Sequence, residues 1–312
     1  MSVAAVFASH TPLKDYYSPG PAIEREVDDC LHAVRGFIAD FAPDLVIAVG
    51  PDHFNGFFYR LMPSFCIGAA ATSVGDWDTP AGPLPVPADA AEACVRAVHA
   101  AGVDIALSHA MEVDHGVTQL LNQVFDWTSL PPVLPVFVNC AAPPLPPLAR
   151  VVALGTALGA FAKRYPGRVL LAASGGLSHD PPIPALAGAP DPVRERLIAG
   201  GVLSPEARAV RQERVLTDAV NQVAGTSPRL PPDARWDEAF LRHLEARDFA
   251  ALLAMDDAAI SHGGGCGGHE IRTWMAVAAA AVAAGCGPFE RRYYRAIPEW
   301  ITGYGVMTAA PG

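Results

Sequence analysis

The sequence predicts an α/β protein, with helices flanking a central, partly parallel sheet in one domain over residues 1–312. Short, continuous apolar runs alternate with longer segments whose apolar residues recur at helical spacing. This is the pattern of strands buried on both faces and of the helices that cover them. A chain of 312 residues with 51% hydrophobic composition can bury a large core. Neither an internal repeat nor a linker divides it.

The first half of the chain reads as alternating strands and helices. Strands at 3–9 and 44–50 enclose a helix at 23–39, which has apolar residues at helical spacing, so they form a β-α-β unit. The further expected elements are a helix at 88–101, strands at 104–108 and 133–139, a helix at 148–162 and a strand at 168–174.

The second half is expected to be mostly helical. Surface loops are predicted at 181–190 and 200–205, a polar helix at 207–223, one amphipathic helix at 236–255, a glycine-rich loop at 261–270 and a helix at 271–284. Five glycines in 261–270 allow the backbone of that loop to come close to a ligand.

Charge and composition exclude several classes of partner. The chain has 32 acidic and 22 basic residues, a formal net charge of -10, and no block of lysine and arginine, so nucleic acid is not an expected partner. No signal-peptide pattern follows the first residue, and the alanine-rich segment 275–285 is too short to span a bilayer. A cytoplasmic protein without a membrane partner is expected.

Six cysteines are scattered along the chain without a CxxC pair, which is typical of reduced, buried thiols. Cys266 is the one cysteine considered as a possible neighbour of a metal, because it lies in GGGCGG close to His269 and Glu270.

Five of the ten histidines lie at strand ends or in glycine-bearing turns, where α/β folds place their sites. They are His10, His53, His115, His179 and His269. His262 is an alternative to His269, and His109, which follows the strand at 104–108, is ambiguous.

Two of these histidines and one glutamate can bind a catalytic metal. His10, His53 and Glu270 would supply two imidazoles and a carboxylate, a set that leaves coordination positions open for chemistry. His115 and His179 each have an aspartate and a glycine nearby, and imidazole exchanges protons near neutral pH, so both are candidates for general acid and base.

Several motifs carry a resemblance to a known family. They are FASHTPL (7–13), GPDHFNGFFY (50–59), GDWDTPAGPLPVP (75–87), MEVDHG (111–116), SGGLSHDPP (174–182), GGHEIRTW (267–274) and RYYRAIPEWITGYG (292–305). In register over nearly the whole chain, they resemble the class III extradiol catechol dioxygenases, in particular those acting on 2,3-dihydroxyphenylpropionate.

The resemblance implies Fe(II) bound by His10, His53 and Glu270, with His115 and His179 as an acid-base pair. It also implies catechol and O2 as substrates, 3-(2,3-dihydroxyphenyl)propionate or its cinnamate analogue in particular, and a homo-oligomer. His179 is expected to be the base and His115 the acid, although the roles could be exchanged.

The group that binds the side-chain carboxylate of such a substrate is not fixed by these motifs. Asn55, Arg292 and Arg295 are candidates. Three alternatives to the main interpretation stay open: a member of the family acting on another catechol, a zinc hydrolase using the same ligands, and a non-catalytic binding protein on the same fold. The segment 174–179 lacks GxSxG, so a serine hydrolase is disfavoured.

Overall fold

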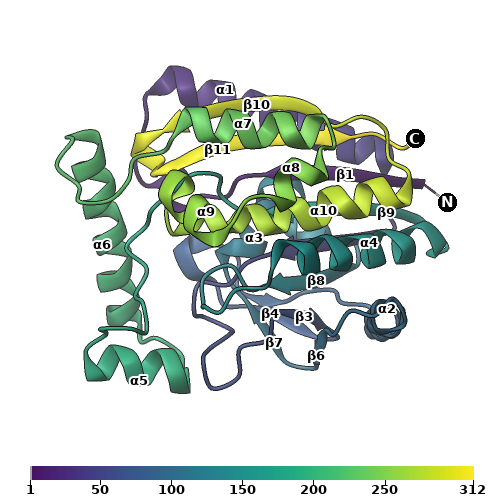
Figure 1. Cartoon of the computed structure of the whole chain (residues 1–312), viewed down its shortest axis with the longest axis horizontal. Coiled ribbons are helices and arrows are strands. Elements are labelled where there is room, and N and C mark those ends of the chain that lie inside the picture. Colours follow the sequence, from purple (N-terminus) through teal and green to yellow (C-terminus); the bar gives the residue numbers. More distant parts are fainter. Residues whose placement is uncertain (1) are drawn as a thin grey trace.

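An eight-stranded mixed sheet forms the centre of the protein, seen in a computed structural model that describes residues 2–312 (Figure 1). The strand order is β10-β11-β1-β9-β2-β8-β3-β6. Strands β1, β9, β2 and β8 are mutually parallel neighbours, whereas β11 pairs antiparallel with β1 and with β10. The strands are β1 (Ser2–Ala8), β2 (Leu45–Gly50), β3 (Phe65–Gly68), β6 (Ala106–Ser108), β8 (Val133–Val138), β9 (Arg168–Ser174), β10 (Glu290–Ile297) and β11 (Thr302–Ala309).

The parallel strands are apolar throughout because both faces of the sheet are covered. Val3, Ala5 and Phe7 of β1 belong to one hydrophobic core, while Ala4 and Val6 belong to the core on the opposite face. Alternate side chains of a strand point to opposite faces, so a continuous apolar run fills both cores.

Helices cover both faces of the sheet. Side chains of α2 (Ala88–Ala100), α4 (Leu148–Arg164) and α10 (Ile271–Ala284) contribute to the first core, and those of α1 (Pro21–Phe41) and α3 (His115–Val124) to the second. Helices α4 and α10 pack closely: a Cβ added at Gly155 or Gly159 would lie 2.1 Å from a backbone oxygen of α10. This packing fixes the helix that begins directly after Glu270.

Smaller elements lie around this framework. A three-stranded sheet has the order β5-β4-β7. Its strands are β4 (Ala71–Ser73), β5 (Gly82–Pro83) and β7 (Met111–Val113). The short 3-10 helices are η1 (Pro12–Asp15), η2 (Asp76–Asp78), η3 (Trp127–Ser129), η4 (Gly267–Glu270) and η5 (Pro298–Trp300). The remaining helices are α5 (Asp191–Ala199), α6 (Pro205–Val223), α7 (Ala234–Glu245), α8 (Phe249–Leu253) and α9 (Asp257–Gly264).

Helices α5 and α6 form an arm along one edge of the molecule, at the left in Figure 1. Arginines of this arm are bonded to backbone carbonyl groups of loops on the main body: Arg196 donates to Phe54 O at 2.9 Å and Arg208 to Gly75 O at 3.0 Å. The arm is thereby attached to the loops that follow β2 and β4.

The predicted α/β architecture is confirmed, and two local predictions are corrected. The single helix expected at 236–255 is two helices, α7 and α8, separated where Arg247 has a φ of 55°. The loop expected at 261–270 is largely helical, because α9 and η4 occupy most of it. The C-terminal hairpin of β10 and β11 was not among the expected elements, because β10 has many exposed polar residues and β11, although buried, contains threonine and glycine as well as apolar residues.

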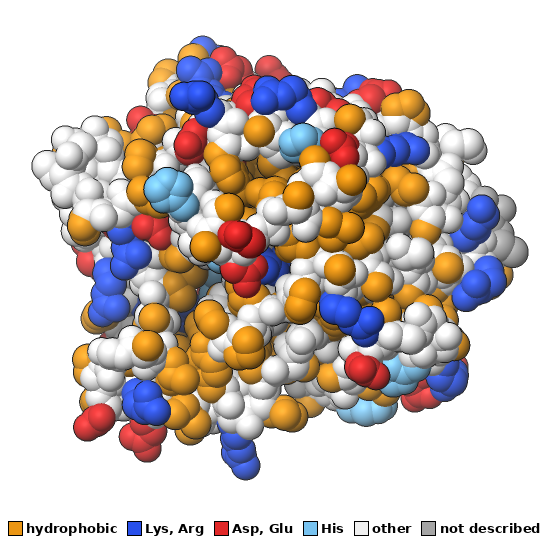
Figure 2. All heavy atoms as spheres, viewed as in Figure 1, with side chains coloured by type: hydrophobic (Ala, Val, Ile, Leu, Met, Phe, Trp, Pro, Cys, Tyr) orange, Lys and Arg blue, Asp and Glu red, His pale blue; other side chains and the backbone are white. Residues whose placement is uncertain are grey.

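Acidic and basic side chains are interspersed over the face shown in Figure 2, without one large patch of either sign. Among residues 2–312, no helix combines the length and the apolar character needed to cross a bilayer.

Candidate active site

The carboxyl ends of three neighbouring strands, β1, β9 and β2, meet at one edge of the sheet. His10 follows β1 by two residues, His53 follows β2 by three, and the turn containing His179 follows β9. In parallel sheets the crevice beyond the carboxyl ends is the usual place for a binding site. The strand pairing therefore brings together histidines that are far apart in the sequence.

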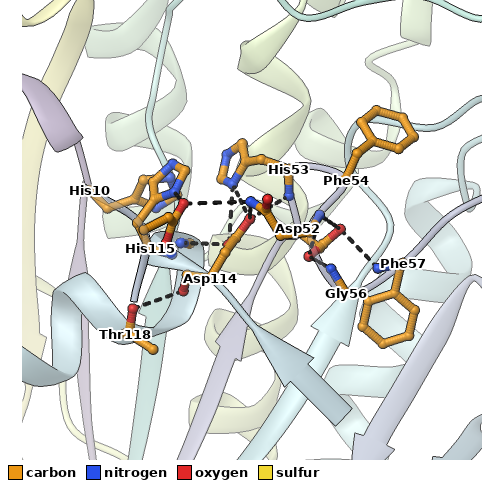
Figure 3. A network of polar contacts seen from close by, with 12 residues as sticks. His10, Asp52, His53, Phe54, Gly56, Phe57, Asp114, His115 and Thr118 are labelled. Atoms are coloured by element: carbon orange, nitrogen blue, oxygen red, sulfur yellow. Dashed lines mark hydrogen bonds and ion pairs between the residues drawn. The ribbon is translucent and has the colours of Figure 1, made fainter. Parts of the chain in front are cut away.

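Three of the predicted histidines face one another (Figure 3). The ring centroids of His53 and His115 are 4.1 Å apart and nearly stacked, whereas His10 lies edge-on at 5.3 Å from His53 and 5.4 Å from His115. His115 is the first residue of α3, and Asp114 caps this helix by accepting from Gly116 N at 2.9 Å.

Glu270 lies among these histidines and is only 3% exposed. Its Oε1 is 3.1 Å from His53 Nε2 and 3.4 Å from His179 Nε2, and its Oε2 is 3.5 Å from His10 Nε2. The amide of Gly176 donates to Oε2 at 2.7 Å. One buried carboxylate thus faces the Nε2 atoms of three imidazoles that come from three separate strand ends.

The remote nitrogens of His10 and His53 are held by other groups. His10 Nδ1 is 3.1 Å from Ser174 Oγ, and His53 Nδ1 is 3.2 Å from Asp114 Oδ2. A partner at Nδ1 fixes the orientation of an imidazole and leaves Nε2 as the ligand atom, as is common for metal-binding histidines. The two rings therefore have the arrangement that a metal requires.

His115 and His179 have different partners at Nδ1. His115 Nδ1 is 2.6 Å from Asp76 Oδ2, and its backbone amide donates to the other carboxylate oxygen at 2.8 Å. His179 Nδ1 is 2.8 Å from the carbonyl oxygen of Leu177. One histidine is thus paired with a carboxylate, and the other with a neutral acceptor.

The electrostatics of the site depend on burial and on this concentration of charge. Burial lowers the pKa of His10 to about 3, so its ring is neutral, the form that binds a metal. Burial also favours neutral His53, but the carboxylates of Asp114 and Glu270 outweigh it and raise the pKa of His53. For Glu270, burial is opposed by the surrounding imidazoles and by hydrogen bonds from His179 and His53, and its pKa is lowered well below the ordinary value.

Several sets of side chains are close enough to hold a metal ion. The ligand atoms of His10, His53 and His115 all lie within 4.8 Å of one another, and so do those of Asp76, Asp114 and His115. The set expected from the sequence has Glu270 in place of His115, and the carboxylate of Glu270 is 3.1 Å from His53 Nε2 and 3.5 Å from His10 Nε2. This expected set supplies an anionic oxygen, and it leaves His115 with Asp76 rather than requiring it as a ligand.

A cavity opens beside these groups and encloses roughly 620 Å³, its mouth included. His10, His53, His115 and His179 line one part of it. The rest of its lining is mainly apolar: Pro12, Leu13, Trp77, Pro181, Pro182, Ile183, Val215, Trp300 and Ile301. A cavity that combines apolar walls with a few polar groups is suited to a small aromatic molecule.

The candidates for a substrate carboxylate are placed differently from one another. Asn55 lies at the site, but its Nδ2 donates to Asp114 Oδ2 at 2.8 Å. Arg292 and Arg295 lie on strand β10, where they pair with Glu290 at 2.8 Å and with Glu26 at 3.0 Å. Neither arginine lines the cavity, and a role of these two residues or of Asn55 in binding a carboxylate stays a prediction.

The other candidate residues of the glycine-rich segment lie outside the group formed by Glu270 and the four histidines around it. Cys266 Sγ is directed to the carbonyl oxygen of Pro181 at 3.4 Å. His269 lies next to Glu270 in sequence, but its ring is bonded to Ser261 at 2.8 Å and to Arg272 at 2.7 Å. His262 and His109 are exposed. The described cysteines are all free thiols.

Two residues at the site were not recognised from the sequence as partners of the histidines, and a third was missed altogether. Asp76 lies in the motif GDWDTPAG, which offered a signal, and Asp114 was noted only as a neighbour of His115 in sequence. Arg211, on a polar helix, lines the cavity, and nothing in its local sequence distinguishes it from other arginines of α6.

Comparison with known proteins agrees with this geometry. The family described as the catalytic LigB subunit of aromatic ring-opening dioxygenase matches residues 4–306. A protein of Cupriavidus pinatubonensis named 2,3-dihydroxyphenylpropionate/2,3-dihydroxicinnamic acid 1,2-dioxygenase is 48% identical over 303 residues, which cover 97% of this chain and 96% of the relative.

Relatives from other bacteria carry the same name. One from Paraburkholderia xenovorans is 48% identical, with 100% of this chain and 98% of the relative covered. One from Mycolicibacterium smegmatis is 44% identical, with 100% and 99% covered. The chain belongs to the LigB family of aromatic ring-opening dioxygenases and is an extradiol dioxygenase.

Proposed function

We propose that the protein is an Fe(II)-dependent dioxygenase that opens the ring of 3-(2,3-dihydroxyphenyl)propionate and of its cinnamate analogue with O2. His10, His53 and Glu270 hold the iron, and His115 and His179 move protons. The observation that carries the proposal is the convergence of His10, His53 and Glu270 beside a largely apolar cavity. The names of relatives that are 44–48% identical over nearly full length support the choice of substrate.

Two imidazoles and one carboxylate are the ligand set typical of non-heme Fe(II) oxygenases. When bound, Fe(II) would supply open coordination positions for a diol and O2 and would allow electrons to pass between them. The neutral ring of His10 and the outer bonds of His53 to Asp114 suit this role.

His179 has the proton arrangement that a general base needs. A carbonyl oxygen can only accept a hydrogen bond, so the contact with Leu177 O places the proton of the neutral ring on Nδ1. Nε2 then carries the lone pair, and because His179 lines the cavity, this atom can take a proton from a catechol hydroxyl. Burial lowers the pKa of His179, but the Glu270 carboxylate raises it by more, so the pKa lies above its ordinary value. A metal cation bound to Glu270 would neutralise part of that negative charge, lower the pKa of His179 and so favour its neutral, basic form.

His115 is suited to the acid role. The Asp76 carboxylate at its Nδ1 stabilises the imidazolium, so that Nε2 can donate a proton to an oxygen that becomes negative as the ring opens. Measuring the protons released when a catechol binds in the absence of O2 shows which of His115 and His179 is the base. His179→Gln should abolish that release, whereas His115→Gln should retain it.

The walls of the cavity favour an aromatic substrate. Trp77 and Trp300 line it together with Leu13 and Ile183, so a catechol ring exchanges water for apolar contacts there. The diol would lie toward the histidines and the side chain toward the remaining walls.

The test is oxygen uptake by protein loaded anaerobically with Fe(II), using a panel of catechols. The proposal expects consumption of one O2 per catechol, a yellow ring-opened product, and the highest kcat/KM with 3-(2,3-dihydroxyphenyl)propionate. Higher kcat/KM with another catechol would reassign the substrate. Activity with Zn(II), with no O2 consumed, would favour a hydrolase and contradict the proposal.

A further inference from the structure

We propose that Arg211 binds the side-chain carboxylate of the substrate and so sets the preference for catechols with an anionic side chain. This inference rests on the proposed function and deepens it. The residue lies on helix α6, within the arm at the left of Figure 1, and not on any of the strand ends that carry the histidines.

Arg211 lines the same cavity as His10, His53, His115 and His179. Among residues 2–312 it is the one guanidinium or ammonium group in that lining. Val215, one helical turn further along α6, also lines the cavity, so this face of the helix forms part of the wall.

The guanidinium is held in place without being neutralised. Its Nη2 donates to the backbone oxygen of His53 at 2.5 Å, and its Nη1 is 3.5 Å from Asn55 Oδ1. Both acceptors are neutral, and a guanidinium has five N–H donors, so donors remain for a further acceptor. The ion pairs of the described chain involve other arginines, and Arg211 has no carboxylate partner among them.

A second positive charge reinforces the field on this side of the site. Arg196 of helix α5 donates to the backbone oxygen of Phe54 at 2.9 Å, and Arg211 donates to that of the adjacent His53, so the two guanidinium groups bind the same loop. Two cations beside a half-buried apolar wall attract an anion more strongly than they would in water. A carboxylate is the acceptor whose planar geometry matches the fork of a guanidinium.

The placement agrees with the shape of the ligand. Because Arg211 touches the backbone of His53, it lies beside the part of the cavity where the diol would bind, on a different element from the histidines. A two-carbon chain on the ring carbon next to the diol would carry a carboxylate from the histidines toward this wall.

The experiment compares two substrates whose side chains differ only in the terminal group, a carboxylate in 3-(2,3-dihydroxyphenyl)propionate and a methyl group in 3-propylcatechol, with the iron-loaded enzyme. Arg211→Gln is expected to lower kcat/KM for the propionate by about 10- to 100-fold, the range expected for a lost hydrogen bond to a charged group. Turnover of 3-propylcatechol should change by less than about threefold. Arg214→Gln is the matched control, because Arg214 is exposed on the same helix and does not line the cavity.

Each outcome decides the assignment. A selective loss with the propionate supports it, and so does a preference of Arg211→Glu for an analogue with an aminoethyl side chain. An unchanged substrate ratio overturns it. Equal loss with both substrates also overturns it, because Arg211 would then act only through the loop of His53. A wild-type enzyme without preference for the propionate would instead refute the proposed substrate, independently of the variants.

Binding without turnover provides a second readout. Trp77 and Trp300 line the cavity, so their fluorescence should respond when 3-phenylpropionate, which has the carboxylate but no diol, enters. Arg211→Gln should weaken this binding by about 10-fold or more, and Arg214→Gln should not. Equal affinity in the two variants would contradict the assignment.

Discussion

The carboxylate of Asp76 holds His115 at two points, with Oδ2 2.6 Å from the ring Nδ1 and Oδ1 accepting from the backbone amide at 2.8 Å. Asp76 lies in η2, whereas His115 begins α3, so the small sheet that joins these regions is part of the catalytic framework. Both residues are buried, which makes the contact hard to replace with water.

Asp76→Asn should therefore lower kcat by about 10- to 100-fold with little change in KM, because the ring of His115 loses the carboxylate that orients it. Iron content should be unchanged. The control is Asp78→Asn, an exposed neighbour bonded to Tyr16. Comparable losses in the two variants would contradict a specific role of Asp76.

The metal content of variants distinguishes a ligand set that includes Glu270 from one that includes His115, each together with His10 and His53. Glu270→Gln should weaken Fe(II) binding by more than the roughly 10- to 100-fold typical of changes to outer partners of a metal site. His115→Gln should keep the metal and lose ring cleavage. The measurement is iron per chain after anaerobic loading and gel filtration. Loss of iron in His115→Gln, with retention in Glu270→Gln, would show that His10, His53 and His115 are the ligands.

Gly267 is expected to be necessary for the position of His179. A Cβ at Gly267 would lie 2.2 Å from His179 Nε2, whereas the nearest atom to a Cβ at Gly268 is 3.6 Å away. Gly267→Ala should displace the ring and lower kcat by about 100-fold, the scale expected for a catalytic group moved by about 1 Å. Gly268→Ala should retain near-normal kcat. Equal kcat in both variants would show that the ring has room to move.

Asp237 should make the unfolding free energy depend on pH. Burial raises its pKa to about 6, although hydrogen bonds from Ser178 and Tyr294 oppose the shift. Because its folded-state pKa exceeds the unfolded value of about 4, its contribution to stability is full below about pH 4 and is lost as the pH rises through about 6.

The shift of about two pKa units corresponds to about 3 kcal/mol. The stability of the wild type relative to Asp237→Asn should thus fall by about that amount between pH 4 and 7, as measured by urea unfolding. Tyr294→Phe removes a donor to the charged form and should extend the decline to higher pH. A pH-independent difference between wild type and Asp237→Asn would refute the raised pKa.

The local pattern of the sequence determined the main elements of the fold. Apolar runs marked β1, β2, β8 and β9, because strands covered on both faces have no polar positions. The hairpin of β10 and β11 was not predicted from the sequence. Strand β10 lies at the edge of the sheet, where exposed and partly buried residues alternate and leave no apolar run. The helical form of 261–264 also escaped, because glycine content alone does not show whether a neighbouring helix supports the backbone.

The sequence by itself also indicated which histidines to consider, because His10, His53 and His179 follow recognisable strands and a family motif accompanies each of them. Only the tertiary structure decided what surrounds these rings. The pairing of Asp76 with His115, the convergence on Glu270 and the place of Arg211 in the cavity wall join segments far apart in the chain. Spacing along one chain carries no information on such distances, which depend on how strands and helices pack.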